Sequence, residues 1–424
     1  MSTEKRDRGP HTLRTLLLLL AGLILWLPAP RQGEAGQATV KKRFVIGGLF
    51  SLTGAWSTLG TSSAVALELA AEDLNAYFDR IDSQLEIAVA IEDTQLDPQL
   101  ALQRLRSLSA RGVRVVVGPQ SSAEVAAIKA FADANDVLLI SQSSTAGSLA
   151  IARDNVLRLC PGDDLEGEAV AALMWADGIR VIVPVWRDDP GNGGLHDAVQ
   201  AHFVTALGGT MLPGVKYAPD TADFSTAAAA LASQVSAARA QHGNNAVAVY
   251  LAAFDEVVAL FQAADASSVL RSTRWYGSDG VALSNALLGD GTAAAFAALT
   301  GYPNPTFGLD AGAQLKWAPV AARIESVTEF APDAFALGVY DAAWLAAQTV
   351  ALGKNKVELG FVKDELPGVA GSFFGTTGWT ILNEAGDRRF GNFDFWAIRD
   401  VEGEPQWVAV AHYNTASGVL VKHD

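Results

Sequence analysis

Two stretches of similar design decide the fold: residues 113–124 (VRVVVGPQSSAE) and residues 137–149 (VLLISQSSTAGSL). Each begins with a short apolar run, breaks into Ser, Thr, Gly or Pro, and leads into a helical pattern. A run of this kind predicts a buried parallel strand followed by a helix. A hydroxyl in the turn can cap the helix, and the free N–H groups of the first helical turn can bind an anion. Two neighbouring turns can therefore bind one carboxylate together.

The sequence on both sides of these stretches alternates between predicted strands and predicted helices. Residues 43–50 and 85–91 are predicted strands ahead of them, and residues 180–185, 246–252 and 274–277 are predicted strands behind them. This alternation predicts an α/β fold with parallel, doubly wound sheets and right-handed crossovers. Helices are predicted at residues 62–78, 123–135, 166–175, 226–240 and 254–264, after the cap pair Asp97–Pro98, and from near His196.

Three interruptions of this strand–helix alternation divide the chain into separate α/β segments. The alternation stops at residues 157–162, again at residues 301–307, and a third time near Thr377. Such breaks between α/β blocks predict two lobes joined by several crossovers. The segment 191–194 (GNGG) is interpreted as a flexible turn ahead of the helix near His196.

The amino terminus has the composition of a secretory signal. Basic residues precede the apolar stretch 16–27 (LLLLLAGLILWL), which is shorter than the roughly 20 residues that a membrane span needs. Residues 1–35 are therefore predicted to be a signal peptide, and an uncleaved anchor is the alternative. Residues 1–35 carry five basic and three acidic side chains, so their removal takes the net charge from −15 to −17. So acidic a protein argues against nucleic acid or anionic lipid as a partner.

Candidate binding residues follow the predicted strands, because ligands of open α/β sheets bind beyond the carboxyl ends of the strands. The alternative for each hydroxyl is that it only caps its own helix. Five hydroxyls after two successive strands favour a carboxylate site. The candidates in the first half of the chain are Trp56, Ser121, Ser122, Ser143, Ser144 and Thr145.

The second half of the chain offers acids and an aromatic residue at matching positions. Asp279 follows a predicted strand and can bind an ammonium group through charge-assisted hydrogen bonds. Its alternative role is a helix N-cap. Asp189 and Phe254 also follow predicted strands, and Phe254 with Trp56 can wall a pocket or simply belong to the core.

Motifs of enzymes are missing from the sequence. None of the six histidines has the spacing of a zinc site, and there is no nucleophile elbow, Walker loop or dinucleotide fingerprint. The single cysteine, Cys160, lies in an apolar stretch and is interpreted as a packed side chain. The sequence therefore predicts a protein that is not an enzyme and that uses no metal or cofactor.

Six motifs follow one another along the chain: IGGLFSLTGAWSTLG, VVVGPQSSAEV, VLLISQSSTA, WYGSDGVA, YDAAWLAAQ and FGTTGWTILNEAGDRR. In this order they resemble the type I periplasmic solute-binding proteins of ABC importers, in particular the branched-chain amino acid binding family. The resemblance covers nearly all of residues 43–415. It implies two Rossmann-like lobes joined by a three-stranded hinge, the first formed by residues 43–160 and 305–380 and the second by residues 161–304 and 381–424.

The resemblance also implies roles for the candidate residues. Ser122, Ser143 and Thr145 take the positions that hold the carboxylate of an amino acid, and Asp279 takes the position of the acid that binds its ammonium group. The aromatic position ahead of a helix is matched by Phe254. The opening loop, with Trp56, lends an apolar contact.

The resemblance also implies that Phe335, further along the chain, lies near the pocket for the ligand side chain. Three residues depart from the family pattern. Pro190 or Gly191 stands where the family has a tyrosine, Asp279 is one methylene shorter than the usual glutamate, and Ser143 adds a hydroxyl. The site is therefore predicted to be more polar than in the family.

These observations together predict a monomeric, extracytoplasmic binding protein. It would capture a small amino acid or related carboxylate between its lobes and deliver it to a membrane permease. The alternatives are a ligand sensor that docks to a separate receptor and, outside this class, an amide hydrolase.

Overall fold

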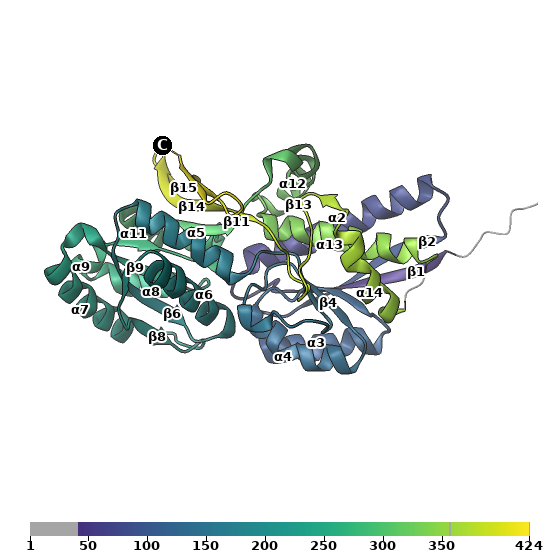
Figure 1. The fold of residues 1–424 in the computed structure, drawn as a ribbon, viewed down its shortest axis with the longest axis horizontal. Helices are drawn as coiled ribbons and strands as arrows, with labels where there is room; N and C mark the ends of the chain where they lie inside the picture. Colours follow the sequence, from purple (N-terminus) through teal and green to yellow (C-terminus); the bar gives the residue numbers. More distant parts are fainter. Residues whose placement is uncertain (1–40, 356–357, 424) are drawn as a thin grey trace, which may run out of the picture. The chain divides into compact units, whose positions relative to one another are not determined.

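Both serine turns follow strands of a five-stranded parallel sheet, which is the central sheet of the first lobe (Figure 1). The computed structural model describes residues 41–355 and 358–423, so the predicted signal peptide lies outside the described residues. The strand order is β2-β1-β3-β4-β5. Along the chain the elements are β1 (Lys42–Phe50), α2 (Ser57–Arg80), β2 (Leu85–Asp93), α3 (Pro98–Ala110), β3 (Val115–Val117), α4 (Ser122–Ala134), β4 (Leu138–Ser141) and β5 (Val156–Arg158).

Successive side chains of these strands enter two different cores, as expected for a sheet covered on both faces. Val115 and Val117 of β3 pack in the core on one face, together with α2. Val116 packs on the other face with residues of α3 and α4. This arrangement explains why the strand reads as an unbroken apolar run. β5 forms where only an interruption of the strand–helix alternation was predicted, because its short apolar run pairs in parallel with β4.

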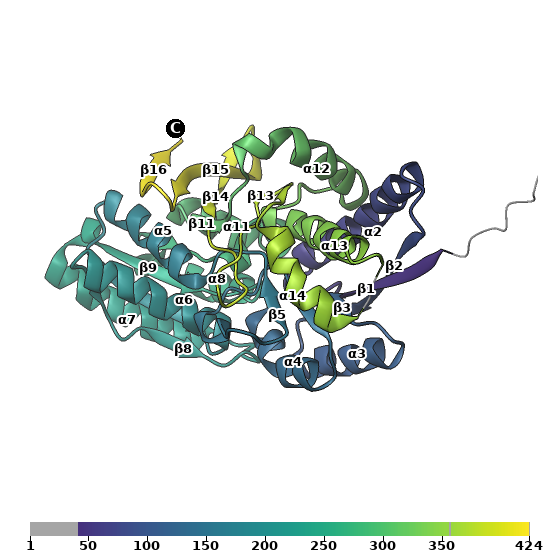
Figure 2. The same cartoon turned by 45° about the vertical axis from the view of Figure 1, so that its right-hand side comes forward.

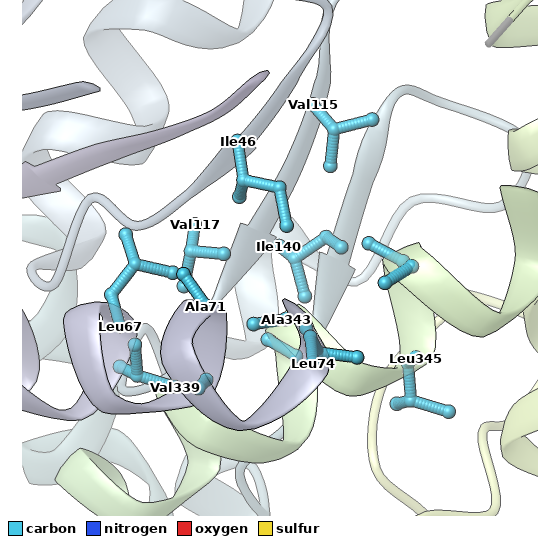
Figure 3. Close-up of a cluster of buried hydrophobic side chains, with 14 of the residues drawn as sticks. Ile46, Leu67, Ala71, Leu74, Val115, Val117, Ile140, Val339, Ala343 and Leu345 are labelled. Atoms are coloured by element: carbon cyan, nitrogen blue, oxygen red, sulfur yellow. The ribbon is translucent and has the colours of Figure 1, made fainter. Parts of the chain in front are cut away.

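A helix from the second half of the chain completes the first core. α13 (Ala334–Leu352) lies alongside α2, as Figure 1 and Figure 2 show. Figure 3 shows Val339 and Ala343 of α13 gathered with Leu67 of α2 and with Ile140 of β4. By length and composition α13 is apolar enough to cross a membrane, but 72% of its apolar window is buried inside the protein. It is the central helix of the first core.

The second lobe is built on another parallel sheet, with strand order β10-β9-β6-β7 and with β8 also paired to β6. One face packs against α7, α8 and α11, and the other against α5 and α6. The elements are α5 (Asp163–Ala176), β6 (Val181–Arg187), α6 (Pro190–Gln200), β7 (Thr210–Met211), β8 (Val215–Tyr217), α7 (Ser225–His242), β9 (Val247–Ala252), α8 (Val257–Asp265), α9 (Ser268–Arg271), β10 (Arg274–Tyr276), α10 (Asn285–Gly289) and α11 (Gly291–Thr300).

The remaining elements form an antiparallel sheet and the helices that return to the first core. The sheet has strand order β11-β14-β15-β16, and its apolar side chains join the cores of the second lobe. This sheet was not predicted from the sequence. The elements are β11 (Asn304–Phe307), α12 (Gln314–Thr328), α13, α14 (Leu359–Ala370), β12 (Phe374–Gly375), β13 (Gly378–Trp379), β14 (Asn392–Val401), β15 (Glu404–Asn414) and β16 (Val419–Lys422).

The chain passes between the two sets of cores three times. The passes lie between Leu159 and Ala169, between Tyr302 and Val320, and between Ala370 and Phe393. Two α/β lobes with parallel sheets and a three-stranded connection were predicted, and the fold confirms this class. The predicted boundary residues of the lobes stay a prediction.

Candidate ligand-binding site

A small cavity lies beyond the carboxyl ends of the strands of both parallel sheets. The space between its lining atoms, with the part open to solvent included, is about 250 Å³, and the room left for water-sized molecules is only about 10 Å³. Seven of the ten predicted site residues line it. The lining residues are Trp56, Ser121, Ser122, Ser143, Thr145, Gly191, Asn192, Leu195, Phe254 and Asp279.

The two serines at the start of α4 have different surroundings. Ser121 is the N-cap and forms a capping box with Glu124, since its hydroxyl accepts from the amide of Glu124 at 3.3 Å and its own amide donates to Glu124 Oε2 at 3.1 Å. The same hydroxyl also donates to Glu124 Oε2 at 2.6 Å. Ser122 faces the other turn, with its hydroxyl 3.0 Å from that of Ser144 and 3.1 Å from the donating amide of Ala146. The two serine turns are therefore joined directly.

The hydroxyl of Ser143 is hydrogen-bonded to the backbone of the first serine turn. Ser143 Oγ donates to the carbonyl of Gln120 at 2.9 Å. The side chain of Gln120 accepts from the amide of Ser51 and donates to the carbonyl of Trp56, both at 3.0 Å. Ser144 is fully buried beside Ser122 and does not line the cavity. Thr145 does line it.

Aromatic rings form one wall of the cavity. The ring centroids of Trp56 and Phe254 lie 4.9 Å apart. Phe335 packs edge-on behind Trp56 at 6.4 Å and does not reach the cavity. The guanidinium of Arg187 lies over the ring of Phe254, 5.5 Å from its centroid. Phe335 therefore supports the wall from the core.

A carboxylate of the second lobe holds the Trp56 loop. The amide of Trp56 donates to Asp255 Oδ2 at 2.6 Å, and the hydroxyl of Ser284 donates to Asp255 Oδ1. Nearby, the amide of Asn285 donates to Thr58 Oγ1 at 3.2 Å. These hydrogen bonds join the two lobes at the rim of the site.

The expectation of a flexible turn at residues 191–194 is wrong, because these residues form the first turns of α6. Asp189 is the N-cap and accepts from the amide of Asn192 at 2.9 Å, and Pro190 occupies the start of the helix. The pair Asp97–Pro98 begins α3 in the same way, and this signal is present at Asp189–Pro190 despite the glycines. Asp189 thus caps a helix and does not line the cavity, whereas Gly191 and Asn192 at the helix start do line it and were not predicted as site residues.

Asp279 lies in the cavity wall with two further acids behind it. Its side chain is 6% exposed, and it does not cap a helix, since Ser278 takes the N-cap position of its helical turn. Glu166 Oε1 accepts the amide of Asp279 at 3.1 Å. Asp163, one turn earlier in α5, packs against Gly194 of α6 so closely that a Cβ there would meet Asp163 Oδ2 at 2.1 Å. Neither Asp163 nor Glu166 was predicted from the sequence to belong to the site.

Burial dominates the electrostatics of these acids. The pKa of Asp279 is raised to about 8, mainly by burial. Among the neighbouring charges, that of Asp163 contributes most to this rise. Burial likewise raises the pKa of Asp163 to about 7, although Thr145, Arg158 and the amide of Gly147 lower it. The pKa of Glu166 is also raised by burial, and then by Asp279 and Asp163. The site therefore holds protons near neutral pH.

The side chain of Arg158 holds the second serine turn through its backbone carbonyls. Its guanidinium donates to the carbonyls of Ser144 and Ala146 at 3.2 and 2.6 Å, and it pairs with Asp387. Cys160 is buried, its thiol donates to the carbonyl of Ser144 at 3.4 Å, and burial raises its pKa.

Two other features of the described residues bear on function. Within residues 41–355 and 358–423, no group of three His, Cys, Asp or Glu side chains is placed to hold a metal ion. A larger hollow, of about 1,100 Å³ empty volume, lies between α5, β10 and β14–β16, and it contains none of the predicted site residues.

The fold and the site define a two-lobed α/β protein with a small polar cavity at the facing strand ends. Residues 44–364 match the model of the family described as periplasmic binding protein, and the chain belongs to this family. It has the type I architecture found in the binding proteins of ABC transporters.

Individual proteins are similar to most of the chain. An uncharacterised protein of Methanocaldococcus jannaschii is 27% identical over 395 residues, which span 88% of this chain and 90% of the relative. The crystal structure of a leucine binding protein from Thermotoga maritima is similar with a TM-score of 0.69 at 18% identity, over 88% of this chain and 99% of that one. A solute binding protein from R. palustris in complex with benzoate gives 0.67 at 17% identity, over 90% and 98%.

Proposed function

We propose that the chain is the extracytoplasmic solute-binding component of an ABC importer and that it captures a small amino acid or related carboxylate. The observation that carries this proposal is the cavity, which has hydroxyl groups on the first-lobe side and Asp279 with Phe254 on the second-lobe side. The protein would bind and deliver its solute without making or breaking a bond. Its export would depend on residues 1–35.

The carboxylate of the ligand would lie at the serine turns. Ser122 lies at the start of α4 and Thr145 follows β4, and both line the cavity. Gly191 and Asn192 bring the start of α6 to the same place. Helix N-termini and hydroxyls can together hold a carboxylate without a buried arginine. This is the ligand group that leucine and benzoate, named for the two similar structures, have in common.

The amine of the ligand would lie against Asp279. A buried carboxylate without a cation partner is a poor neighbour for an aromatic acid and a good one for an ammonium group. An amino acid is therefore the preferred class. The polar lining, with Asn192 and Ser143, favours a small or polar side chain over a large aliphatic one.

The proposal is tested by thermal unfolding of the mature protein with a panel of amino acids and carboxylates. A ligand at about one hundred times its dissociation constant should add roughly 2.7 kcal/mol to the free energy of unfolding. Ser122→Ala should weaken the best hit, and the control Ser236→Ala, on the exposed face of α7, should not. A panel without any stabilising compound, or hydrolysis of an amide substrate, would contradict the proposal.

A further inference from the structure

The larger hollow of the second lobe lies at the end of β10 that is opposite to the ligand cavity. Arg274, at the start of β10, lines the hollow, whereas Asp279, which follows the end of this strand, lines the cavity. The other walls of the hollow come from α5, from the end of α11 and from β14–β16, which pack against these helices (Figure 2). The hollow and the cavity are therefore different sites.

The hollow has the size of a small-molecule site. The space between its lining atoms, with the part open to solvent included, is about 1,100 Å³, and the room left for water-sized molecules is about 490 Å³. Sites for small ligands typically measure about 300–1,000 Å³. The ligand cavity leaves only about 10 Å³ in the same structure. The hollow can therefore admit a small organic molecule without a movement of the lobes.

Basic side chains predominate among the charged residues of the hollow, although the protein carries a net charge of −15. The acid that lines it is Asp177, and both of its carboxylate oxygens are engaged. Lys422 pairs with Oδ1, and the hydroxyl of Tyr276 donates to Oδ2 at 2.6 Å. Lys422 therefore already balances the charge of Asp177. The basic lining residues are Arg274, Arg399, Lys422 and His423.

Two arginines of the lining keep unused hydrogen-bond donors. Arg274 comes no closer than 3.9 Å to the carboxylate of Asp177, and it donates one hydrogen bond, to the backbone carbonyl of Asp177 at 3.3 Å. The guanidinium of Arg399 has no hydrogen bond or ion pair with any group of residues 41–355 and 358–423. A guanidinium presents a planar fork of donors that matches a carboxylate or phosphate group. Water would satisfy these donors on an open surface, but here they line a hollow of ligand size.

Apolar side chains form the rest of the lining. Leu173 of α5 and Pro303 ahead of β11 lie on one side, and Val408 and Val410 of β15 lie on the other. Both valines are only partly buried. Apolar surface left open beside unpaired cations suits a ligand that has both an anionic and an apolar part.

We propose that this hollow is a second binding site, which takes a small organic anion. Its carboxylate or phosphate group would bind Arg274 and Arg399, and its apolar body would cover Val408 and Val410. The anion would then join β10 of the parallel sheet to β14 of the antiparallel sheet. This site is separate from the ligand cavity, and the inference does not rest on the proposed function.

The experiment is calorimetric titration of the mature protein with matched probes. Hexanoate and phenyl phosphate have a charge and an apolar body, hexanamide has the body without the charge, and inorganic phosphate has the charge without the body. Hexanoate should bind at least about tenfold more tightly than hexanamide, and phenyl phosphate at least about tenfold more tightly than inorganic phosphate. Added salt should weaken both anions, because the arginines are partly exposed.

Nuclear magnetic resonance of the backbone amides locates the bound probe. The signals of Trp275 and Val410, which line the hollow, should shift on addition of phenyl phosphate. A probe that binds only in the ligand cavity would instead shift those of Ser122 and Phe254. These measurements use the wild-type protein, so they do not depend on the folding of a variant.

A pair of variants then tests the role of the guanidinium. Arg399→Gln should weaken the binding of phenyl phosphate at least about tenfold. Arg43→Gln, on the exposed start of β1 in the first lobe, removes the same charge from the protein and should leave the affinity unchanged. Thermal unfolding without a probe shows whether each variant retains its fold.

Several results would overturn the inference. Equal binding of hexanamide and hexanoate would show that the charge is not recognised, and equal binding of the two phosphates would leave an adventitious ion only. The hollow is not the site if Arg399→Gln loses no more affinity than Arg43→Gln, or if the signals of Trp275 and Val410 do not move. The inference also fails if no probe binds. None of these results bears on the ligand cavity, which the amino acid panel tests separately.

Discussion

Arg158 and Asp387, 229 residues apart in the chain, form a buried side-on ion pair in which Nε and Nη2 donate to the two carboxylate oxygens at 2.5 and 2.7 Å. The remaining nitrogen of Arg158 holds the carbonyls of Ser144 and Ala146. The last segment between the lobes is thus tied to the turn that is proposed to bind the ligand.

Asp387→Ala should therefore be strongly destabilising. Removal of one partner from a buried pair leaves an uncompensated charge, at a cost of about 3–5 kcal/mol. Urea unfolding should show this loss. The exposed pair of Arg323 with Glu72 provides the control, because Glu72→Ala should change stability by about 1 kcal/mol or less. Equal losses for both variants would show that the buried pair has no special role.

The stability of the ligand-free protein should fall as the pH rises. Asp163 and Asp279 have pKa values of about 7 and about 8 in the folded state, above the unfolded value near 3.9. Their contribution is therefore fully present below about pH 4 and is lost as the pH rises through about 7–8. At pH 8, Asp279→Asn should be more stable than the wild type by about 1–3 kcal/mol. Thermal unfolding across this range, with the exposed Asp188→Asn as control, measures the difference.

Two adjacent glycines of α6 should respond oppositely to alanine. A Cβ at Gly194 would lie 2.1 Å from Asp163 Oδ2, whereas a Cβ at Gly193 would meet nothing within 4 Å. Gly194→Ala should cost about 1–3 kcal/mol through overpacking. Gly193→Ala should be stabilising by up to about 1 kcal/mol, because alanine favours the helix. Chemical unfolding of the two variants compares them directly, and similar values would contradict the close packing of α5 on α6.

The two serines of α4 should separate stability from binding. Ser121→Ala removes a capping box and should lower the free energy of unfolding by about 1 kcal/mol. Ser122→Ala should instead weaken ligand binding by about fivefold or more, the equivalent of one hydrogen bond of about 1 kcal/mol. Calorimetric titration with the best ligand of the panel, beside an unfolding curve for each variant, tests this. Unchanged binding in Ser122→Ala would remove this serine from the site.

Asp255→Asn should speed ligand dissociation. The carboxylate accepts hydrogen bonds from Trp56 of the first lobe and from Ser284. An amide at this position weakens a charge-assisted hydrogen bond between the lobes, so the closed form should open more readily. Stopped-flow dissociation should be several-fold faster, with association nearly unchanged. Asp265→Asn, which removes the charge that pairs with the exposed Arg271, is the control; an equal effect there would argue against a contact specific to the lobe rim.

Local patterns in the sequence predicted much of the fold. The unbroken run of Val115, Val116 and Val117 marks a strand buried on both faces, and the periodicity of residues 62–78 marks most of α2. Glycines misled the prediction at α6, where the cap pair Asp189–Pro190 outweighs the low helix propensity of GNGG. The antiparallel sheet was missed because β14 and β15 are stabilised by pairing and by packing on the second lobe.

The sequence by itself determined most strands and helices of the two parallel sheets, and it placed hydroxyls and Asp279 after strands, because periodicity and turn chemistry are local properties. Only the tertiary structure decided that Ser121 serves as a cap while Ser122 joins the other turn, that Asp163 and Glu166 lie behind Asp279, and that Arg158 pairs with Asp387. These relationships depend on how separate elements pack. A buried charge is stabilised or strained by neighbours that lie far away in the chain, and local periodicity does not specify such neighbours.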